Sequence, residues 1–381
     1  MQNKKVNWFP LLATNFFGVL NDNFLKKAVS FISIYWIAQG NENEIIAIAG
    51  ALFIIPYLLL SPFSGFLAKI YLKRKIVVFA KIIEIPIMAI ASIGFITNSI
   101  YFVMTAIFLM GLQSCIHSPA KYGLIRDTGG KEKISFGIGA LEMLSFLGNL
   151  IGAVLAGYIS DLTENRNAFI IGLFISFAVT GWITSKFIKP KESEPIKSQK
   201  ENLNPIVFLY KSIKWSKSVK GLNFIILGLA FFWLAAAMIE MNLISHCPKA
   251  LGMSNSHTGL VMAMVAVSVA IGSFLSGVLS NKKVELALVP IGGIGFALNI
   301  SLIYLLEPSN TLFTVLIIMS AFFAGLYKIP LNAFLQERVE GRKLGDIILQ
   351  EQLTIVGHLA MGIVHFYLTH GINITILEII Q

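Results

Sequence analysis

Long apolar segments recur along this chain and constrain its fold more than any other feature. A helix that crosses a bilayer needs about 20 mainly apolar residues, and only 13% of the residues here are charged, against about 25% in soluble domains. The sequence therefore predicts an all-α integral membrane protein. We expect eleven spans, near residues 8–38, 44–68, 76–97, 100–118, 134–160, 167–188, 221–246, 256–280, 284–306, 311–334 and 346–369.

The basic residues predict how these spans are oriented. With the N-terminus in the cytoplasm, 24 of the 30 lysine and arginine residues fall in cytoplasmic segments, whereas Arg166 and Lys249 fall outside. Cytoplasmic loops carry the excess of basic residues in membrane proteins, so we expect a cytoplasmic N-terminus. The net charge of +10 is spread over every inner loop instead of gathered on one face, which argues against nucleic-acid binding.

The longest polar segment divides the chain into two parts. It is basic, contains proline and follows the sixth predicted span. We predict an N-terminal six-helix half at 1–188, a cytoplasmic basic linker at 189–220 and a C-terminal half at 221–381. The C-terminal half has five full spans, and the apolar segment from Gly371 onward is too short for a twelfth, which indicates a truncated chain or an abnormal end.

Two predicted spans share a pattern that indicates a duplicated half. EMLSFLGNLIG begins at Glu142 in the fifth span, and EQLTIVGHLAMG begins at Glu351 in the eleventh. SPAKYGLIRD and IPLNAFLQER precede them at similar distances. Two parallel six-helix repeats are a transporter layout, and this architecture resembles the major facilitator superfamily. The marker loop of that family survives partly as GFLAKIYLKRK, with Lys69 in place of the usual acid.

Charged residues interrupt the first apolar span, in FGVLNDNFLKKAVSF. On a helix, Asn15, Gly18, Asp22 and Lys26 lie on one stripe, and the last two are spaced to pair. A charge at the bilayer centre costs about 3 kcal/mol or more unless it faces a bundle interior or a watery cavity. We therefore expect the stripe to line a central substrate-binding cavity. A structural ion pair between helices is the alternative.

Other charged residues within predicted spans point to an inner gate or to further substrate contacts. Glu240 and Lys328 differ in sign within one half, so we expect them to pair or to share the charges of a ligand. Glu84 adds a carboxylate in the third span. For the two repeat glutamates, ion pairs of an inner gate compete with a substrate role: Glu142 with Lys121 or Arg126, and Glu351 with Arg338 or Arg342.

The sequence offers no constellation typical of an enzyme. It contains no G-x-S-x-G, no H-E-x-x-H and no Walker A lysine loop. None of its six histidines is followed five residues later by aspartate, the spacing used in phospholipid acyl transfer. We expect no catalytic residue, no metal and no cofactor.

Three motifs together resemble one family of lipid transporters. NDNFLKKA in the first span, SPAKYG at the end of the fourth and PLNAFLQER at the end of the tenth are similar to the bacterial lysophospholipid transporters of the LplT type. They are also similar to the transporter domain that some bacteria fuse to acyltransferase and acyl-ligase domains. The resemblance implies a multi-pass protein of the bacterial inner membrane that moves lysophosphatidylethanolamine and lysophosphatidylglycerol to the cytoplasmic leaflet by alternating access.

The resemblance also implies partners and residue roles. A separate acyltransferase or acyl-acyl-carrier-protein synthetase would re-acylate the lipid. Asp22 matches the first-helix acid of the family, and Lys121 matches the lysine of its span-4 motif. The seventh span departs from the family, because FFWLAAAMIE carries Glu240 where an arginine is expected, and Lys328 then supplies the compensating cation. The candidate substrate-binding residues are Asp22, Lys26, Asn15, Lys121, Glu240 and Lys328.

Two alternatives stay open at this stage. The first is a transporter of the same fold for another small amphiphile or metabolite. The second is a non-transporting membrane module that docks a phospholipid acyltransferase through residues 185–221.

Overall fold

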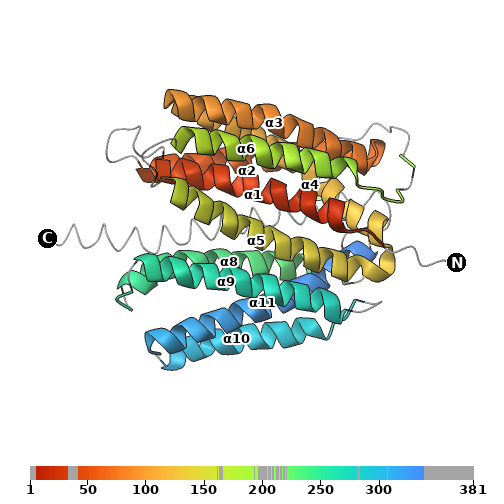
Figure 1. Cartoon of the computed structure of the whole chain (residues 1–381). Helices are drawn as coiled ribbons and strands as arrows, with labels where there is room; N and C mark the ends of the chain where they lie inside the picture. Colours follow the sequence, from red (N-terminus) through yellow and green to blue (C-terminus); the bar gives the residue numbers. More distant parts are fainter. Residues whose placement is uncertain are drawn as a thin grey trace.

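A computed structural model describes residues 6–32, 42–160, 166–192, 221–249, 255–280, 284–306 and 308–338, with a few positions between them. Long α-helices account for most of these residues (Figure 1). Their bounds are α1 Phe9–Ile32, α2 Glu42–Ile70, α3 Lys73–Thr97, α4 Ile100–Gly129, α5 Ile134–Ser160, α6 Arg166–Lys186, α8 Leu222–Lys249, α9 Asn255–Leu279, α10 Leu288–Leu306 and α11 Asn310–Arg338, with a 3-10 turn, η2, at Lys131–Lys133.

Most of these helices have the length and composition of membrane spans. Within the described part of the chain, seven are long and apolar enough to cross a bilayer, and the two parts of α2, which meet at an angle of 43°, add an eighth. The predicted eleventh span, 346–369, lies outside the described residues, as does the segment that begins at Gly371.

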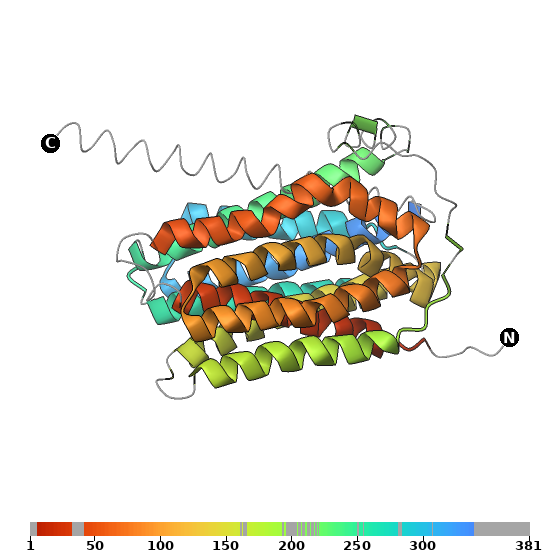
Figure 2. The same cartoon turned by 90° about the horizontal axis from the view of Figure 1, so that it is seen from above.

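The helices form two groups that lie side by side (Figures 1 and 2). In the first group, α1 packs on α5 and α6, while α4 packs on α2 and α3. In the second group, α11 packs on both α9 and α10 and also contacts α8. The main contact between the groups is made by α5 and α9, with a smaller one between α5 and α11.

The two groups share a core at one end of the bundle. We name this the basic end, because α3 begins there with Lys73 and Arg74 and the turn η2 there carries Lys131 and Lys133. It lies on the right in Figure 1, near the N-terminus. One hydrophobic cluster at this end combines side chains of α1 to α5 with Ile188, which follows α6, and two from α11: Leu11, Ala68, Ile76, Val77, Ala120, Leu124, Ile125, Ile134, Ile138, Leu141, Ile188, Ile329 and Ala333. Apolar burial therefore holds the groups together at the basic end.

Glycines let α5 and α9 approach closely at the basic end. A Cβ atom on Gly139 would lie 2.7 Å from the Ser273 carbonyl oxygen and 3.0 Å from the Gly277 Cα. At the opposite end, the described apolar clusters each belong to one group. The cluster around Phe24, Met88 and Phe174 is built from the first group, and the cluster around Leu243 and Phe313 from the second.

The expected end of the fourth span at residue 118 is wrong. Helix α4 continues through Pro119 to Gly129, so Lys121 and Arg126 lie on a helix and not in a loop. The polar residues in this stretch are paired: Lys73 Nζ lies 2.6 Å from Asp127 Oδ2, and the Lys121 ammonium lies 4.9 Å from the centre of the Tyr122 ring. Because α3 pairs with Asp127 and a ring of α4 itself contacts Lys121, the drop in hydropathy does not end the helix.

Candidate functional site

A buried ion pair within α3 is linked to α1 inside the first group by a hydrogen bond from Asn21. Lys81 Nζ lies 2.6 Å from Glu84 Oε2, and the two side chains are 2% and 1% exposed. Asn21 Nδ2 donates a hydrogen bond of 2.9 Å to the other oxygen, Glu84 Oε1. The Lys81 ammonium lies directly over Gly18, where a Cβ atom would collide with it. We name Asn21, Lys81 and Glu84 the inner cluster.

Asp22 lies beside the inner cluster and is held by α4. Ser114 Oγ donates to Asp22 Oδ2 over 3.2 Å and is also 3.1 Å from Gln113 Oε1. Lys26, one turn further along α1, places its ammonium 4.5 Å from the centre of the Phe53 ring on α2. Both Lys81 and Lys26 are close enough to act on Asp22 electrostatically.

Asn15, predicted to line the cavity with Asp22, instead ties α1 to α5 in this conformation. Its Nδ2 donates to Ser145 Oγ over 2.8 Å and to the Leu141 carbonyl oxygen over 3.3 Å. Asn15 is buried. The stripe expected from the sequence therefore splits here, with Asp22 beside charged groups and Asn15 in a helix contact.

A second set of charged groups joins the two helix groups. Lys328 Nζ on α11 lies 2.9 Å from Glu142 Oε2 on α5, and Tyr122 on α4 donates its hydroxyl to Glu142 Oε1 over 2.9 Å. The side chains of Lys328 and Glu142 are 1% and 6% exposed. Their sequence neighbours, Ile329 and Leu141, belong to the shared hydrophobic cluster. We name Tyr122, Glu142 and Lys328 the bridging cluster.

Aromatic rings surround the Lys328 ammonium. Its Nζ lies 4.3 Å from the centre of the Trp233 ring, 5.2 Å from that of Phe232 and 5.4 Å from that of Phe146. Phe232 and Trp233 come from α8, whereas Phe146 lies one turn after Glu142 on α5. A cation within about 6 Å of an aromatic ring centre is attracted by the ring quadrupole, so the rings add to the ion pair.

Lys121 lies between the two sets of charges. It interacts electrostatically with Glu142 and with Asp22, and also with Lys81 and Lys328. The first, third, fourth, fifth and eleventh helices therefore present one connected arrangement of buried charge. Moving such groups out of water is costly unless they are paired and hydrogen-bonded, and the Lys81–Glu84 and Glu142–Lys328 pairs meet that condition.

Glu142 and Lys328 pair with each other in the structure, a pairing that the sequence did not predict. The sequence left Glu142 either an ion pair with Lys121 or Arg126 or a substrate role, and left Lys328 either a pair with Glu240 or a shared ligand. Arg126 instead donates from Nη1 to the Gln336 carbonyl oxygen of α11 over 3.1 Å. The reason is that α5 of one group faces α11 of the other, a proximity that spacing within one half does not reveal.

Several candidate residues fall outside the described part of the chain. Glu240 lies on α8 and Arg338 ends α11, but their side chains are not described. Glu351 lies wholly outside the described residues.

Sequence reasoning did not select Lys81, Tyr122 or the three rings around Lys328. The spacing of Lys81 and Glu84, three residues apart in an apolar run, is a signal that could have revealed this pair. Nothing comparable marks the rings, because they come from helices that are distant in sequence.

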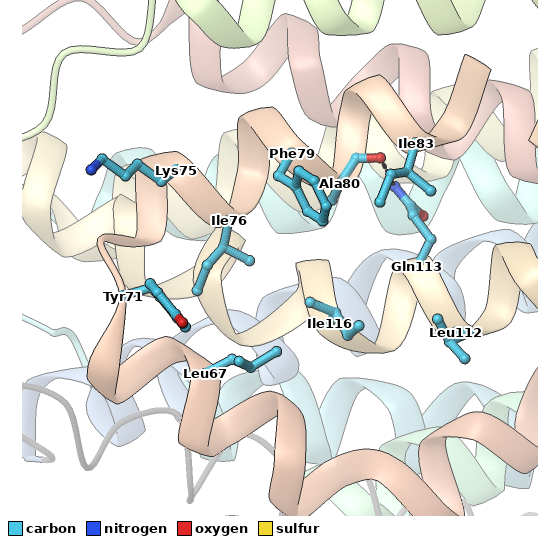
Figure 3. A pocket seen from close by; sticks show the side chains of 10 residues that line it. All are labelled: Leu67, Tyr71, Lys75, Ile76, Phe79, Ala80, Ile83, Leu112, Gln113 and Ile116. Atoms are coloured by element: carbon cyan, nitrogen blue, oxygen red, sulfur yellow. Dashed lines mark hydrogen bonds between the residues drawn. The ribbon is translucent and has the colours of Figure 1, made fainter. Parts of the chain in front are cut away.

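An apolar groove lies within the first group. Its cavity of about 520 Å³ lies between α2, α3 and α4. Figure 3 shows Tyr71 and Lys75 at one end and Gln113 at the other. Gln113 Nε2 donates to the Ala80 carbonyl oxygen over 3.1 Å. Among the described residues, no group of three or more histidine, cysteine or acidic side chains is placed to hold a metal ion.

Asn21 offers a direct test of the inner cluster. Asn21→Leu removes the donor to Glu84 and to the Phe174 carbonyl oxygen, and a buried acceptor that loses its partner costs about 1–3 kcal/mol. We expect a lower midpoint of thermal unfolding in a non-ionic detergent. The matched control is Asn23→Leu, because Asn23 donates only to the Val19 carbonyl oxygen of its own helix among the contacts given for it. Equal midpoints for the two variants would contradict the role given to Asn21.

Comparison with known proteins places this arrangement in a family. Residues 11–349 match the sequence profile of the Major Facilitator Superfamily. The chain belongs to the major facilitator superfamily. The fold predicted from the two-half layout is therefore confirmed, and the apolar helices are those of a multi-pass membrane protein of this superfamily.

Several curated relatives share one name. A protein of Photorhabdus laumondii named lysophospholipid transporter LplT is 27% identical over 332 residues, which cover 86% of this chain and 79% of the relative. Proteins of the same name from Escherichia fergusonii and Citrobacter koseri are 27% and 26% identical, and the matches cover 75% and 86% of this chain and 70% and 79% of the relatives.

Solved structures agree on the fold alone. The human organic anion transporter MFSD10 (TETRAN) superposes with a TM-score of 0.73 at 13% identity, over 94% of this chain and 93% of that one. A bacterial homologue of the iron transporter ferroportin in an outward-facing state superposes with a TM-score of 0.72 at 15% identity, over 93% of this chain and 90% of that one. The Escherichia coli fucose:proton symporter superposes with a TM-score of 0.73 at 11% identity, over 98% of this chain and 94% of that one.

Proposed function

We propose that this protein is a secondary transporter that moves lysophospholipids across a bacterial inner membrane to its cytoplasmic leaflet. The observation that carries the proposal is the match over 332 residues to a protein named lysophospholipid transporter. The fold does not define the substrate, because transporters of fucose and of organic anions share it. An acyltransferase or acyl-acyl-carrier-protein synthetase would then re-acylate the product.

The arrangement of charges supports a substrate with a charged headgroup. Ionisable residues within membrane spans mark substrate pathways by default, and here they occur on several helices. A lysine suits a phosphate as a point charge, so we assign Lys26, Lys121 and Lys328 to the phosphate. Asp22 is one candidate carboxylate for the ammonium of an ethanolamine headgroup. The roles proposed for Asn15 and Glu240 in substrate binding rest on the sequence.

The proposed mechanism is alternating access. We take α1–α6 and α8–α11 as parts of the two halves expected at 1–188 and 221–381, joined by the linker at 189–220. Basic connections lie at the end where the groups share a core, and with the N-terminus in the cytoplasm this is the cytoplasmic end. The described conformation is then closed to the cytoplasm. Contacts made by Glu142 and Arg126 form the gate, to which the sequence adds Glu351 and Arg338.

Reconstitution into vesicles tests this function. The purified protein is placed in vesicles with labelled lysophosphatidylethanolamine in the outer leaflet, and the label that albumin can still extract is measured over time. We expect the extractable fraction to fall faster than in protein-free vesicles. An unchanged rate would reject lysophospholipid transport, and binding of an acyltransferase by a protein inactive in this assay would favour a docking module.

A further inference from the structure

The groups around Lys328 have the composition of a binding site for an ammonium ion. Three aromatic rings lie with their centres 4.3 to 5.4 Å from Nζ, and the Glu142 carboxylate lies 2.9 Å from it. Several aromatic faces gathered around one cation are the arrangement that recognises ammonium ligands. We name Glu142, Phe146, Phe232 and Trp233 the ammonium cage.

The cage contains more than a gate requires. An ion pair between α5 and α11 needs only Glu142 and Lys328, yet two residues of α8 and one more of α5 also face the ammonium. Tyr122 fixes the second carboxylate oxygen through its hydroxyl, so Glu142 is oriented even without Lys328. The cage is therefore preorganised by residues other than its occupant.

From this geometry we propose that the cage binds the ammonium of a zwitterionic lysophospholipid headgroup. Lys328 fills the cage in the described conformation and leaves it when a headgroup enters. This inference rests on the proposed function and specifies the substrate at the bridging cluster. In such a headgroup an ammonium and a phosphate are joined by a two-carbon link, so the displaced Lys328 ammonium meets the phosphate while the substrate ammonium meets Glu142.

The exchange conserves charge in the buried site. Before it, one carboxylate faces one ammonium, and after it, two such oppositely charged pairs are present. An anionic headgroup without an ammonium breaks this balance, because Lys328 can pair with the phosphate only by leaving Glu142 buried without a cation. A buried charge without a partner is strongly disfavoured. The structure thus assigns a preference for ethanolamine or choline headgroups over glycerol.

Chemical rescue tests whether the cage binds ammonium ions independently of transport. Lys328→Met removes the resident ammonium and leaves the stem of the side chain nearly unchanged. We expect methylammonium chloride to raise the thermal unfolding midpoint of this variant above that in the same concentration of sodium chloride. The unaltered protein, whose cage is filled, should show no such difference. Equal midpoints of Lys328→Met in the two salts would overturn the proposal.

Headgroup selectivity tests the cage in the working transporter. Trp233→Leu and Phe146→Leu should lower the uptake of lysophosphatidylethanolamine relative to lysophosphatidylglycerol, by about 2- to 30-fold for each ring lost. Phe231→Leu is the matched control, since Phe231 neighbours the cage in sequence but is 57% exposed. Trp233→Phe keeps a ring and should restore part of the ratio even if Trp233→Leu folds poorly.

The two proposals fail in different ways. If the unaltered protein moves neither lipid, lysophospholipid transport is wrong. If it moves both, and the cage variants reduce both equally, transport stands and the ammonium cage is overturned. A native preference for lysophosphatidylglycerol would overturn the cage as well.

Discussion

Replacing Lys328 with glutamine is expected to lower the unfolding midpoint of the purified protein sharply and to stop its transport cycle. The substitution leaves the Glu142 carboxylate buried without its ionic partner, which lies 2.9 Å away in the structure. Removing one member of a buried pair costs about 3–5 kcal/mol. Glu142→Gln should have an effect of similar size, because it strands the Lys328 ammonium instead.

The double variant distinguishes the interaction between Lys328 and Glu142 from the contribution that each residue makes to stability by itself. If Lys328 and Glu142 act on each other, Lys328→Gln combined with Glu142→Gln should be much more stable than the sum of the single losses predicts. Thermal unfolding in a non-ionic detergent gives the midpoints for all four proteins. Additive losses would show that the ion pair does not contribute as a unit.

Replacing Gly139 with leucine is expected to open the basic end. The new side chain would meet the Ser273 carbonyl oxygen and the Gly277 Cα, and backbone atoms of a helix do not rotate aside. This steric clash can be relieved only if α5 and α9 move apart. Overpacking of this kind costs about 1–3 kcal/mol, which corresponds to a shift of about 5- to 150-fold in a conformational equilibrium.

Cysteine labelling measures this opening. In a background of Cys115→Ser and Cys247→Ser, Ala333→Cys introduces a thiol at a fully buried position of the shared cluster. Its reaction with a polar maleimide should be faster when Gly139→Leu is present, and lysophospholipid movement should fall. Gly172→Leu is the matched control, because a Cβ atom there meets nothing within 4 Å. Equal labelling with both leucine variants would contradict the role of the glycine contact.

Many of the helices could be predicted because a helix that crosses lipid needs about 20 mainly apolar residues. Apolar runs marked α3, α5 and α6 to within three residues at each end. The prediction was wrong at α4, because protein neighbours there replace lipid as the surroundings of Lys121 and Arg126. Hydropathy describes a helix against lipid, and it is least informative where helices bury polar residues against one another.

The candidate residues likewise divide into those that one helix reveals and those that depend on contacts between segments distant in sequence. Asp22 was selected because one helix carries several charges, and its position follows from that helix alone. The pairing of Glu142 with Lys328 joins positions 186 residues apart, and the rings around Lys328 come from two helices besides its own. Such contacts depend on how the two helix groups pack against each other, and this packing cannot be predicted from the sequence of one span.

The shared core at the basic end has a consequence for temperature. Its members are almost all aliphatic side chains, and the attraction between such groups weakens on cooling because it is largely entropic near room temperature. The penalty for desolvating a buried ion pair such as Glu142–Lys328 also grows on cooling. A chilled membrane should therefore favour the state in which the two groups part at this end.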